Sequence, residues 1–392
     1  MKHLTSALPA LLIACDPAPP GPGALIGDDT AWLRTFGSPK SDESWGIDLH
    51  DGDLFLSTHL ANPTLTDGYL YRLTPTGEVV WEAKWGEDFT EELFAVVVHH
   101  GVVHVGGARF TSALNLWDTE ALLLRFDAET GAVLGEPWRH DDDGAWNEID
   151  GIVVDDDHIY LAGWGESQDG DFLMVRLDHE GVEEKVSFWG TEAWEEANGH
   201  MVLVGDRLYV AGRLGANGVL SGGDAVLVAM DMPEMNEVWQ ASWGEDGSTE
   251  DAYGLTTDGE YLYAVGVQSQ DEGLVLWSWD LEGTLRWVST WGGDGTERGR
   301  AIRCDPVDGS IVVAANSDGA GSLDIVMLRL DATSGELLEE HRWGGDKDDE
   351  AHDFVLDGDS GYLSGQTRSW GAGNWDAMGV RFEMRPWRFP EE

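Results

Sequence analysis

The stretch Leu285-Arg286-Trp287-Val288-Ser289-Thr290-Trp291-Gly292 is one copy of a pattern that recurs along the chain of 392 residues. Each copy has an aromatic residue, followed in six copies directly by glycine, and then an acidic or amide pair a few residues later. The aromatic residues are Phe36, Trp85, Trp138, Trp189, Trp243, Trp291 and Trp343. A spacing of about 50 residues that fills the chain indicates one structural unit present in seven copies.

Within the quoted copy, apolar and polar residues alternate as they do in a strand. In four copies a second tryptophan lies four residues earlier, a spacing that places both rings on one face of a strand. These tryptophans are Trp32, Trp81, Trp239 and Trp287. The glycine directly after the aromatic residue indicates a chain reversal at the end of that strand.

Two further columns of the repeat are acidic. The pairs are Asp42-Glu43, Glu91-Glu92, Asn147-Glu148, Glu195-Glu196, Glu250-Asp251, Glu297-Arg298 and Asp349-Glu350. A single acid opens a later strand in six copies, whereas the fifth copy has Gly273 at that place. These acids are Asp67, Glu120, Asp171, Asp224, Asp324 and Asp376.

Each unit also contains a short strand that ends in small residues, such as Leu208-Tyr209-Val210-Ala211-Gly212. Turn signals such as Asp331-Ala332-Thr333-Ser334-Gly335 separate the strands. Four short strands per unit and no helical period predict an all-β chain, a seven-bladed β-propeller of four-stranded blades. A β-solenoid is the structural alternative, although its coils usually repeat at shorter periods.

From about Trp32 to Phe382 these motifs resemble the bacterial seven-bladed β-propeller repeat family, with its aromatic-glycine start, Tyr-x-x-Gly strand end and Gly-x-x-Asp opening. The resemblance implies the fold and no single activity. Stretches such as Thr74-Pro75-Thr76-Gly77 leading to Trp81 also resemble the propeller lipoproteins of outer-membrane assembly and the quinoprotein dehydrogenases. Those relatives usually have eight blades, which argues against close kinship.

The ends of the repeat predict how the ring closes. The last copy stops after its third strand, at Phe382, and the matching fourth strand is residues 31–36 at the other end of the chain. We therefore expect this N-terminal strand to complete the last blade, so that no edge is left unpaired. The propeller would span residues 30–383, and residues 384–392 would form a C-terminal tail.

The N-terminus has the features of a bacterial lipoprotein. Residues 1–14 contain an apolar stretch too short to span a bilayer, which predicts a signal peptide. The stretch Leu12-Ile13-Ala14-Cys15 resembles a lipobox with Cys15 as the lipid attachment site, and residues 15–29 form a Pro/Gly-rich tether. We expect a cell-envelope protein anchored through its lipid, on the periplasmic side or at the cell surface.

The charge of the chain is extreme. Lysine and arginine total 23 against 74 acids, which gives a formal net charge of −51. Nucleic acid and anionic lipid are therefore poor partners. Solubility in a saline medium, binding of divalent cations and binding of a basic protein remain as three explanations.

In a propeller the loop before each inner strand and the loop between the second and third strands open on the same face. The acidic pairs and the single acids should thus form rings around the mouth of a central channel. One interpretation is that they bind backbone N–H groups of their own turns. The other is structural Ca²⁺, because carboxylates a few ångströms apart raise one another's pKa unless a cation neutralises them.

Function is expected where the repeat departs from its own pattern. The third copy replaces Trp-Gly by Trp138-Arg139-His140, and the sixth has Arg298 in the acidic column with Arg300 two residues on. We take Arg139, His140, Arg298 and Arg300 as candidate binding residues. An arginine pair can bind a carboxylate or phosphate in a bidentate manner, although Arg298 could equally neutralise its acidic neighbours.

Other reactive residues give weaker signals. His99, His100 and His104 form the only histidine cluster along the sequence, on the face opposite the acidic rings, and no further zinc ligand is evident near them. Cys304 is expected to be a buried small residue with no disulfide partner. No catalytic motif is recognisable.

Together these features predict a non-enzymatic lipoprotein that presents an acidic propeller face to a protein or glycan partner. No cofactor is required, and Ca²⁺ is the ion that the acids would suit. We expect a monomer. The alternatives are a scaffold similar to the outer-membrane-assembly lipoproteins and a channel-centred enzyme of quinoprotein or lyase type.

Overall fold

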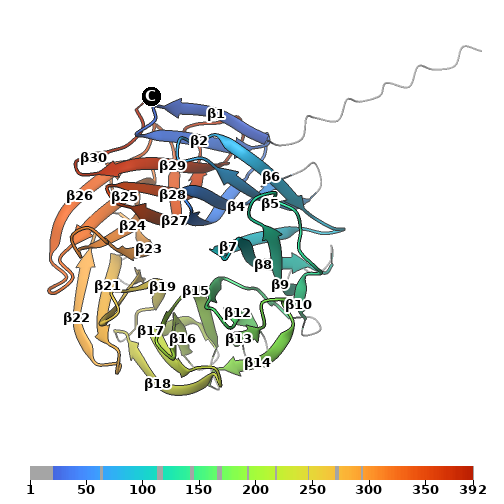
Figure 1. Cartoon of the computed structure of the whole chain (residues 1–392). Coiled ribbons are helices and arrows are strands. Elements are labelled where there is room, and N and C mark those ends of the chain that lie inside the picture. The colour runs from blue at the N-terminus through green and yellow to red at the C-terminus, as the bar shows by residue number, and fades with distance from the viewer. Residues whose placement is uncertain are drawn as a thin grey trace, which may run out of the picture.

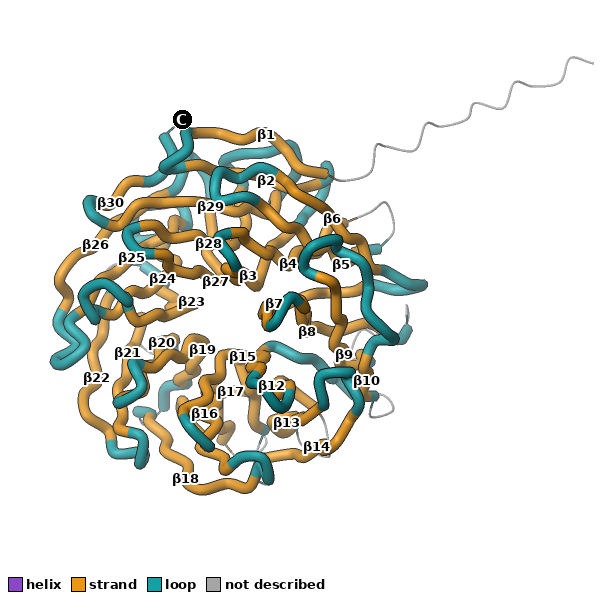
Figure 2. Tube along the Cα trace, in the orientation of Figure 1, coloured by secondary structure: helices purple, strands orange, loops and turns teal. Residues whose placement is uncertain are grey.

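The computed structural model describes residues 21–61, 65–112, 118–141, 145–165, 170–191, 194–216, 219–245, 247–269, 273–292 and 295–391. Every regular element in these ranges is a β-strand, and the strands form a closed ring of radial sheets (Figures 1 and 2). The described part of the chain contains no helix long and apolar enough to cross a bilayer.

The ring consists of seven antiparallel blades, each with its first strand nearest the centre. Blade 1 contains β3 (Glu43–His50), β4 (Asp53–Ala61), β5 (Thr66–Leu73) and β6 (Val79–Trp85). Blade 2 contains β7 (Glu91–His99), β8 (Val102–Phe110), β9 (Thr119–Asp127) and β10 (Trp138–His140). Blade 3 contains β11 (Gly151–Val154), β12 (Ile159–Gly165), β13 (Asp171–Leu177) and β14 (Glu183–Trp189). Blade 4 contains β15 (Glu195–Val204), β16 (Arg207–Ala216), β17 (Val219–Asp231) and β18 (Asn236–Trp243). Blade 5 contains β19 (Glu250–Thr257), β20 (Tyr261–Gln268), β21 (Gly273–Asp280) and β22 (Leu285–Trp291). Blade 6 contains β23 (Glu297–Cys304), β24 (Ile311–Ser317), β25 (Asp324–Leu330) and β26 (Leu337–Trp343).

Blade 7 joins the two ends of the chain. Its inner strands are β27 (Asp349–Asp357), β28 (Ser360–Thr367) and β29 (Asp376–Met384), and β2 (Trp32–Gly37) pairs antiparallel with β29 as the fourth strand. The predicted all-β, seven-bladed propeller with four-stranded blades, closed by the N-terminal strand, is therefore confirmed.

Both chain ends extend blade 7 further than the sequence suggested. Strand β1 (Gly21–Gly27) pairs with β2 on the outside of the ring, inside the segment predicted to be a tether. At the other end, β30 (Trp387–Arg388) pairs with β29, and the Trp343 indole N–H donates to the Pro390 carbonyl at 3.1 Å. The C-terminal tail thus contacts the fold through β30 and Pro390. Residues 15–20, Cys15 among them, lie outside the described residues.

The apolar core is divided into seven clusters, one between each pair of neighbouring blades. Strand β2 contributes to two of them, because its side chains alternate between the two faces of blade 7. Trp32 and Phe36 pack against blade 1, and Leu33 packs against blade 6. Closure of the ring therefore depends on this one short strand.

Tryptophans of the outer strands connect successive blades. The Trp32 indole N–H donates to the Pro75 carbonyl at 2.9 Å, in the turn between the last two strands of the next blade. Trp81, Trp239 and Trp287 make the same contact with the carbonyls of Ala128, Leu281 and Ala332. A positive-φ glycine of each receiving turn, such as Gly131 at φ 71°, lies directly against the indole ring, where a Cβ would be too close.

Five blades have a glycine within the second strand, and a close backbone approach requires it there. Inner strands carry a β-bulge, for example between Ala252 and Gly254 of β19, that turns one carbonyl toward the second strand. A Cβ on Gly266 would lie 1.7 Å from the carbonyl oxygen of Asp251. The same close approach occurs at Gly107, Gly163, Gly212 and Gly365.

Candidate functional site: the central channel and its rim

The first member of each acidic pair is buried and binds its own loop. Asp42 has an exposure of 0% and accepts the Ser38 and Ala61 backbone N–H groups, each at 2.6 Å. Asp349 accepts the Gly345 N–H at 2.7 Å in the same manner. Glu91, Glu195, Glu250 and Glu297 are equally buried at the corresponding places. Glu91, Glu195 and Glu250 also accept a backbone N–H of their own loop, whereas Glu297 accepts the Ser317 hydroxyl.

The single acids of the third strands meet the first members at the repeat glycine. A Cβ on Gly190 would lie 2.1 Å from the Asp171 carboxylate and 2.8 Å from that of Glu195. The same convergence occurs at Gly37, Gly86, Gly244 and Gly344, with Asp376, Asp67, Asp224 and Asp324 as the third-strand acids. Glycine is therefore required here because two carboxylates approach from neighbouring strands.

Blade 2 shows how the pattern changes when the glycine is replaced. Arg139 stands at the glycine position, and its guanidinium binds Glu120 at 2.5 Å and Glu87 at 2.6 Å. The first member is Asn147, an amide rather than a carboxylate. Arg139 therefore acts within the local charge network. His140 packs between Trp138 and Phe188.

The second members of the pairs face the channel. The residues two positions further along each inner strand line a central cavity, and side chains two apart in a strand point the same way. The second members Glu43, Glu92, Glu148, Glu196 and Asp251 form an arc in which neighbours influence one another's pKa. Arg298 and Glu350 continue the ring in blades 6 and 7.

The central cavity has a volume of about 340 Å³ and receives side chains from the inner strands of all seven blades. The upper layer consists of Trp45, Phe94, Asp150, Asn198, Tyr253, Arg300 and His352. Trp45 stacks on His352 with ring centroids 4.2 Å apart, and Arg300 lies over the Tyr253 ring at 5.7 Å. Deeper in the cavity, Arg303 binds Asp353 at 2.5 Å.

Buried carboxyl groups concentrate on blades 3 to 5. Burial raises the pKa of the Glu148, Asp150, Glu196 and Asp251 carboxyls, and the charges of Glu148 and Glu196 raise the pKa of Asp150 further. Arg213 lies 3.2 Å from Glu196 and 3.9 Å from Asp251. No ion pair among the described residues reaches Glu148 or Asp150. This arc is thus under-neutralised.

The opposite side of the rim is better compensated. Burial alone would raise the pKa of Glu43, but its hydrogen bond with His59 and the charges of His59 and His352 lower it to about 2. Glu350 lies 3.7 Å from His352, and after the opposing effect of burial this partner lowers its pKa. The channel is therefore acidic on one side and close to neutral on the other.

A row of aromatic side chains borders the acidic side. Trp146 stacks near Trp164 at 6.1 Å, and Trp164 meets Trp194 edge-on at 5.2 Å. Phe110 extends the row beyond Trp146, at 5.7 Å. All four rings are partly exposed. Arg213 lies over Trp194 at 4.3 Å while its guanidinium binds Glu196, so this rim already holds one cation between an aromatic ring and a carboxylate.

Replacing Glu148 by Gln is expected to raise the thermal midpoint at pH 8, with a gain that shrinks toward pH 5. Because the folded-state pKa of Glu148 lies above its ordinary value of 4.5, the stability it contributes is full at low pH and is lost as pH rises. The measurement is circular-dichroism melting at constant ionic strength. Glu129→Gln, on an exposed turn, removes the same charge. An equal gain in both variants would contradict this account.

Other candidate residues lie apart from the channel or have structural roles. Cys304 is half-buried, and burial raises its thiol pKa to about 11, which fits the predicted unreactive cysteine. Arg298 is exposed, and Arg300 two positions on reaches the cavity. Of the expected arginine pair, Arg300 therefore lines the cavity, whereas Arg298 is not among the residues that line it.

Most of the cavity lining was not identified from the sequence. The sequence signal for the lining is the position two residues after the second residue of each acidic pair. No two copies agree there: the seven residues are Trp, Phe, Asp, Asn, Tyr, Arg and His. The columns that hold the ring repeat, whereas this column is different in every blade.

The chain matches no protein-family model and no curated protein. Among solved structures it is similar to the WD40 domain of Pan2 from Neurospora crassa, with a TM-score of 0.52 and 10% identity over 89% of this chain and 91% of that one. It is also similar to quinohemoprotein alcohol dehydrogenase from Comamonas testosteroni, with a TM-score of 0.50 and 12% identity over 95% of this chain and 75% of that one. At these identities the similarity shows the β-propeller fold alone.

Proposed function

We propose that this chain is a non-enzymatic cell-envelope lipoprotein, anchored through Cys15, whose channel rim binds a cationic segment of a protein partner. The observation that carries the proposal is the under-neutralised arc of Glu148, Asp150, Glu196 and Asp251 beside the row of tryptophans. A partner's positive charge would favour the ionised form of these carboxyls, whose pKa values are raised first by burial and, at Glu148, Asp150 and Asp251, also by neighbouring carboxylates.

The binding mode of Arg213 supports a guanidinium or ammonium ligand. Its side chain combines a carboxylate contact with an aromatic face, and a partner's arginine could use Glu148 and Trp146 in the same way. The formal charge of −51 would also accelerate the approach of a basic protein. The asymmetric lining of the cavity favours one defined ligand over a symmetric ion.

A glycan is the second candidate, favoured by the partly exposed row Phe110, Trp146, Trp164 and Trp194. Flat aromatic rings beside carboxylate acceptors suit the apolar faces and hydroxyl groups of sugars. A channel-centred enzyme of quinoprotein or lyase type is the third. It would be supported by bound chromophore absorbance or by a spectral change on adding quinone with Ca²⁺.

The test is fluorescence anisotropy of a labelled hexa-arginine peptide titrated with the full chain in detergent. We expect saturable binding that weakens as NaCl rises, and binding at least about tenfold weaker in the Glu148→Gln/Asp150→Asn variant. The control is Glu129→Gln/Glu180→Gln, which removes the same charge from exposed turns between third and fourth strands. Equal weakening in both double variants would show that only total charge matters and would overturn the proposal.

We also propose that Ca²⁺ binds where the first acid of a pair and the acid of the third strand converge. The buried Glu91 carboxylate has its pKa raised to about 7 by burial and by the nearby Asp67 charge, and one of its oxygens has no hydrogen-bond partner among the described residues. The peptide titration is therefore repeated with Ca²⁺ replacing part of the NaCl at constant ionic strength. A change specific to Ca²⁺ supports ion binding, and identical curves contradict it.

A further inference from the structure

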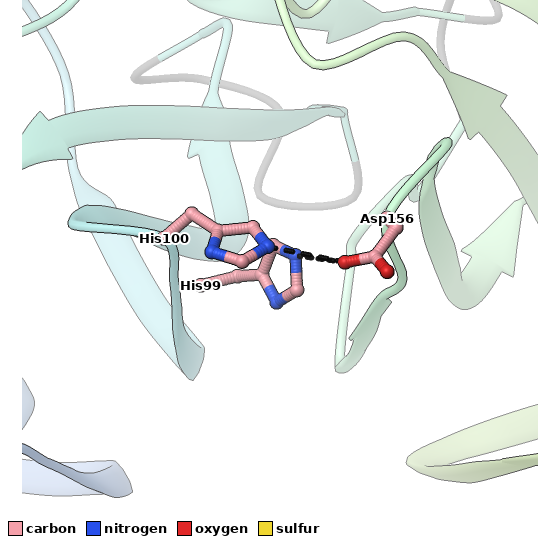
Figure 3. A group of neighbouring side chains, drawn as sticks. All are labelled: His99, His100 and Asp156. Carbon is pink, nitrogen blue, oxygen red and sulfur yellow. Dashed lines mark hydrogen bonds and ion pairs between the residues drawn. The ribbon is translucent and has the colours of Figure 1, made fainter.

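On the face opposite the acidic pairs, side chains from two neighbouring blades converge. His99 is the last residue of β7, His100 follows it in the turn to β8, and Asp156 lies in the turn between β11 and β12 of blade 3. Figure 3 shows both imidazole rings directed at the Asp156 carboxylate. The sequence offered no further ligand near His99 because Asp156 comes from the next blade.

The spacing of these atoms suits a small divalent ion. His100 Nε2 lies 3.1 Å and His99 Nε2 lies 3.7 Å from the same Asp156 oxygen. Ligands at about 2.0–2.1 Å from a tetrahedral Zn²⁺ are separated by about 3.4 Å. One ligand atom from each of the three residues lies within 4.8 Å of the others. Two imidazole nitrogens and a carboxylate are a donor set that zinc accepts.

The backbone holds both turns in place. His100 has a φ of 47°, a left-handed conformation that is uncommon for residues other than glycine, and Gly101 follows at 78°. In blade 1 the corresponding residues are Asp51 and Gly52, the more usual pair for such a turn. On the other side, the Asp155 carboxylate accepts the N–H groups of residues 157 and 158, at 2.8 and 2.7 Å, which fixes the turn that carries Asp156.

A third imidazole lies beside the cluster. His179, in the turn between β13 and β14, stacks parallel to His99 with ring centroids 6.0 Å apart, and its carbonyl accepts from Arg125 at 2.7 Å. Burial and the neighbouring charges of His100 and His179 lower the pKa of His99. His104 is buried nearby on β8, and burial lowers its pKa to about 3.

We propose that His99, His100 and Asp156 form a binding site for a divalent transition-metal ion, Zn²⁺ in the first place, that links blade 2 to blade 3. His179 is not one of the three ligands, and its stack on His99 would help to hold that ring in place. Since the site lies on the face away from the channel rim, it is independent of the proposed partner binding. The negative charge of the whole chain would also attract a metal ion to this site.

The test is a competition titration of Zn²⁺ against a chelating indicator, using the full chain in detergent. We expect one equivalent of bound Zn²⁺ that is weakened at least about tenfold by His100→Ala and by Asp156→Asn. The matched control is His50→Ala, because His50 ends β3 in blade 1 as His99 ends β7 in blade 2. It should bind Zn²⁺ as the wild type does. Circular-dichroism melting verifies that each variant is folded.

A second readout uses Co²⁺ in place of Zn²⁺, since its visible absorption reports coordination geometry. Bands of a four-coordinate ion in the wild type, and their loss in Asp156→Asn, would support the site. Absence of saturable Zn²⁺ binding in the wild type would overturn the proposal and leave the cluster as a histidine–carboxylate ion pair. Equal affinity in wild type, His100→Ala and Asp156→Asn would overturn it as well, by placing the ion elsewhere.

Discussion

Deleting residues 21–37 is expected to unfold the whole propeller, because this segment supplies both outer strands of blade 7. Trp32, Leu33 and Phe36 are at most 1% exposed and belong to two inter-blade cores. Losing one buried aromatic or leucine side chain costs about 2–5 kcal/mol. Three such losses approach or exceed the about 5–15 kcal/mol that stabilises a typical domain. The exposed edge of β29 would also promote aggregation.

The control for this deletion is removal of residues 21–27 alone. Strand β1 is the outermost strand and its side chains are mostly exposed, so its loss should leave a folded ring with a slightly lower midpoint. Near-ultraviolet circular dichroism and size-exclusion chromatography distinguish the two outcomes. A cooperatively folded, monomeric protein without residues 21–37 would show that blade 7 does not depend on β2.

Replacing Gly266 by Ala should destabilise the protein by about 3 kcal/mol or more, at the upper end of the cost of overpacking. The new Cβ would lie 1.7 Å from the Asp251 carbonyl oxygen, which is backbone and cannot rotate away. The inner strand of blade 5 would therefore have to move, and Asp251 with it. Urea unfolding monitored by tryptophan fluorescence measures the loss.

Blade 6 provides the reverse change as a control. Ala315 occupies the place of Gly266, opposite Gly299 of the inner strand. Because that blade has already accommodated a Cβ, Ala315→Gly should cost about 1 kcal/mol or less. Should Gly266→Ala prove as mild as Ala315→Gly, the close approach at the bulge would not be what requires glycine.

The fold could be predicted because the contacts that build it repeat. Trp81 and Trp287 recur at one position since each donates to a turn of the next blade, and Gly131 and Gly335 recur since those turns lie against the indole rings. A contact made once per blade leaves the same residue in each copy. The periodicity of the sequence thus records the contacts between blades.

The ends of the propeller could not be predicted in the same way. Strand β1 is rich in glycine and proline, and its side chains are mostly exposed, so it shows no apolar alternation. Its pairing with β2 depends on backbone hydrogen bonds, which any sequence can supply. Pro390 and Phe389 pack near Trp343, a contact across a long sequence separation that no local pattern announces.

The sites were harder to predict than the fold because each combines residues that occur in only one copy of the repeat. Asp156 meets His100 only because neighbouring blades bring their turns together. In the channel, Trp45, Asp150 and Arg300 share a layer without sharing chemistry, so no motif connects them. The repeated columns of the sequence are those that hold the ring together.

The seven cavity positions from Trp45 to His352 have a consequence for how such a protein can be altered. The interlocking tryptophans, the buried first acids and the bulge glycines are separate side chains from those that line the lumen. Mutational drift or a combinatorial library confined to these seven positions would sample new ligands on an unchanged scaffold. In this architecture the residues that assemble the ring are therefore distinct from those that would recognise a ligand, and each blade contributes one residue of the second kind.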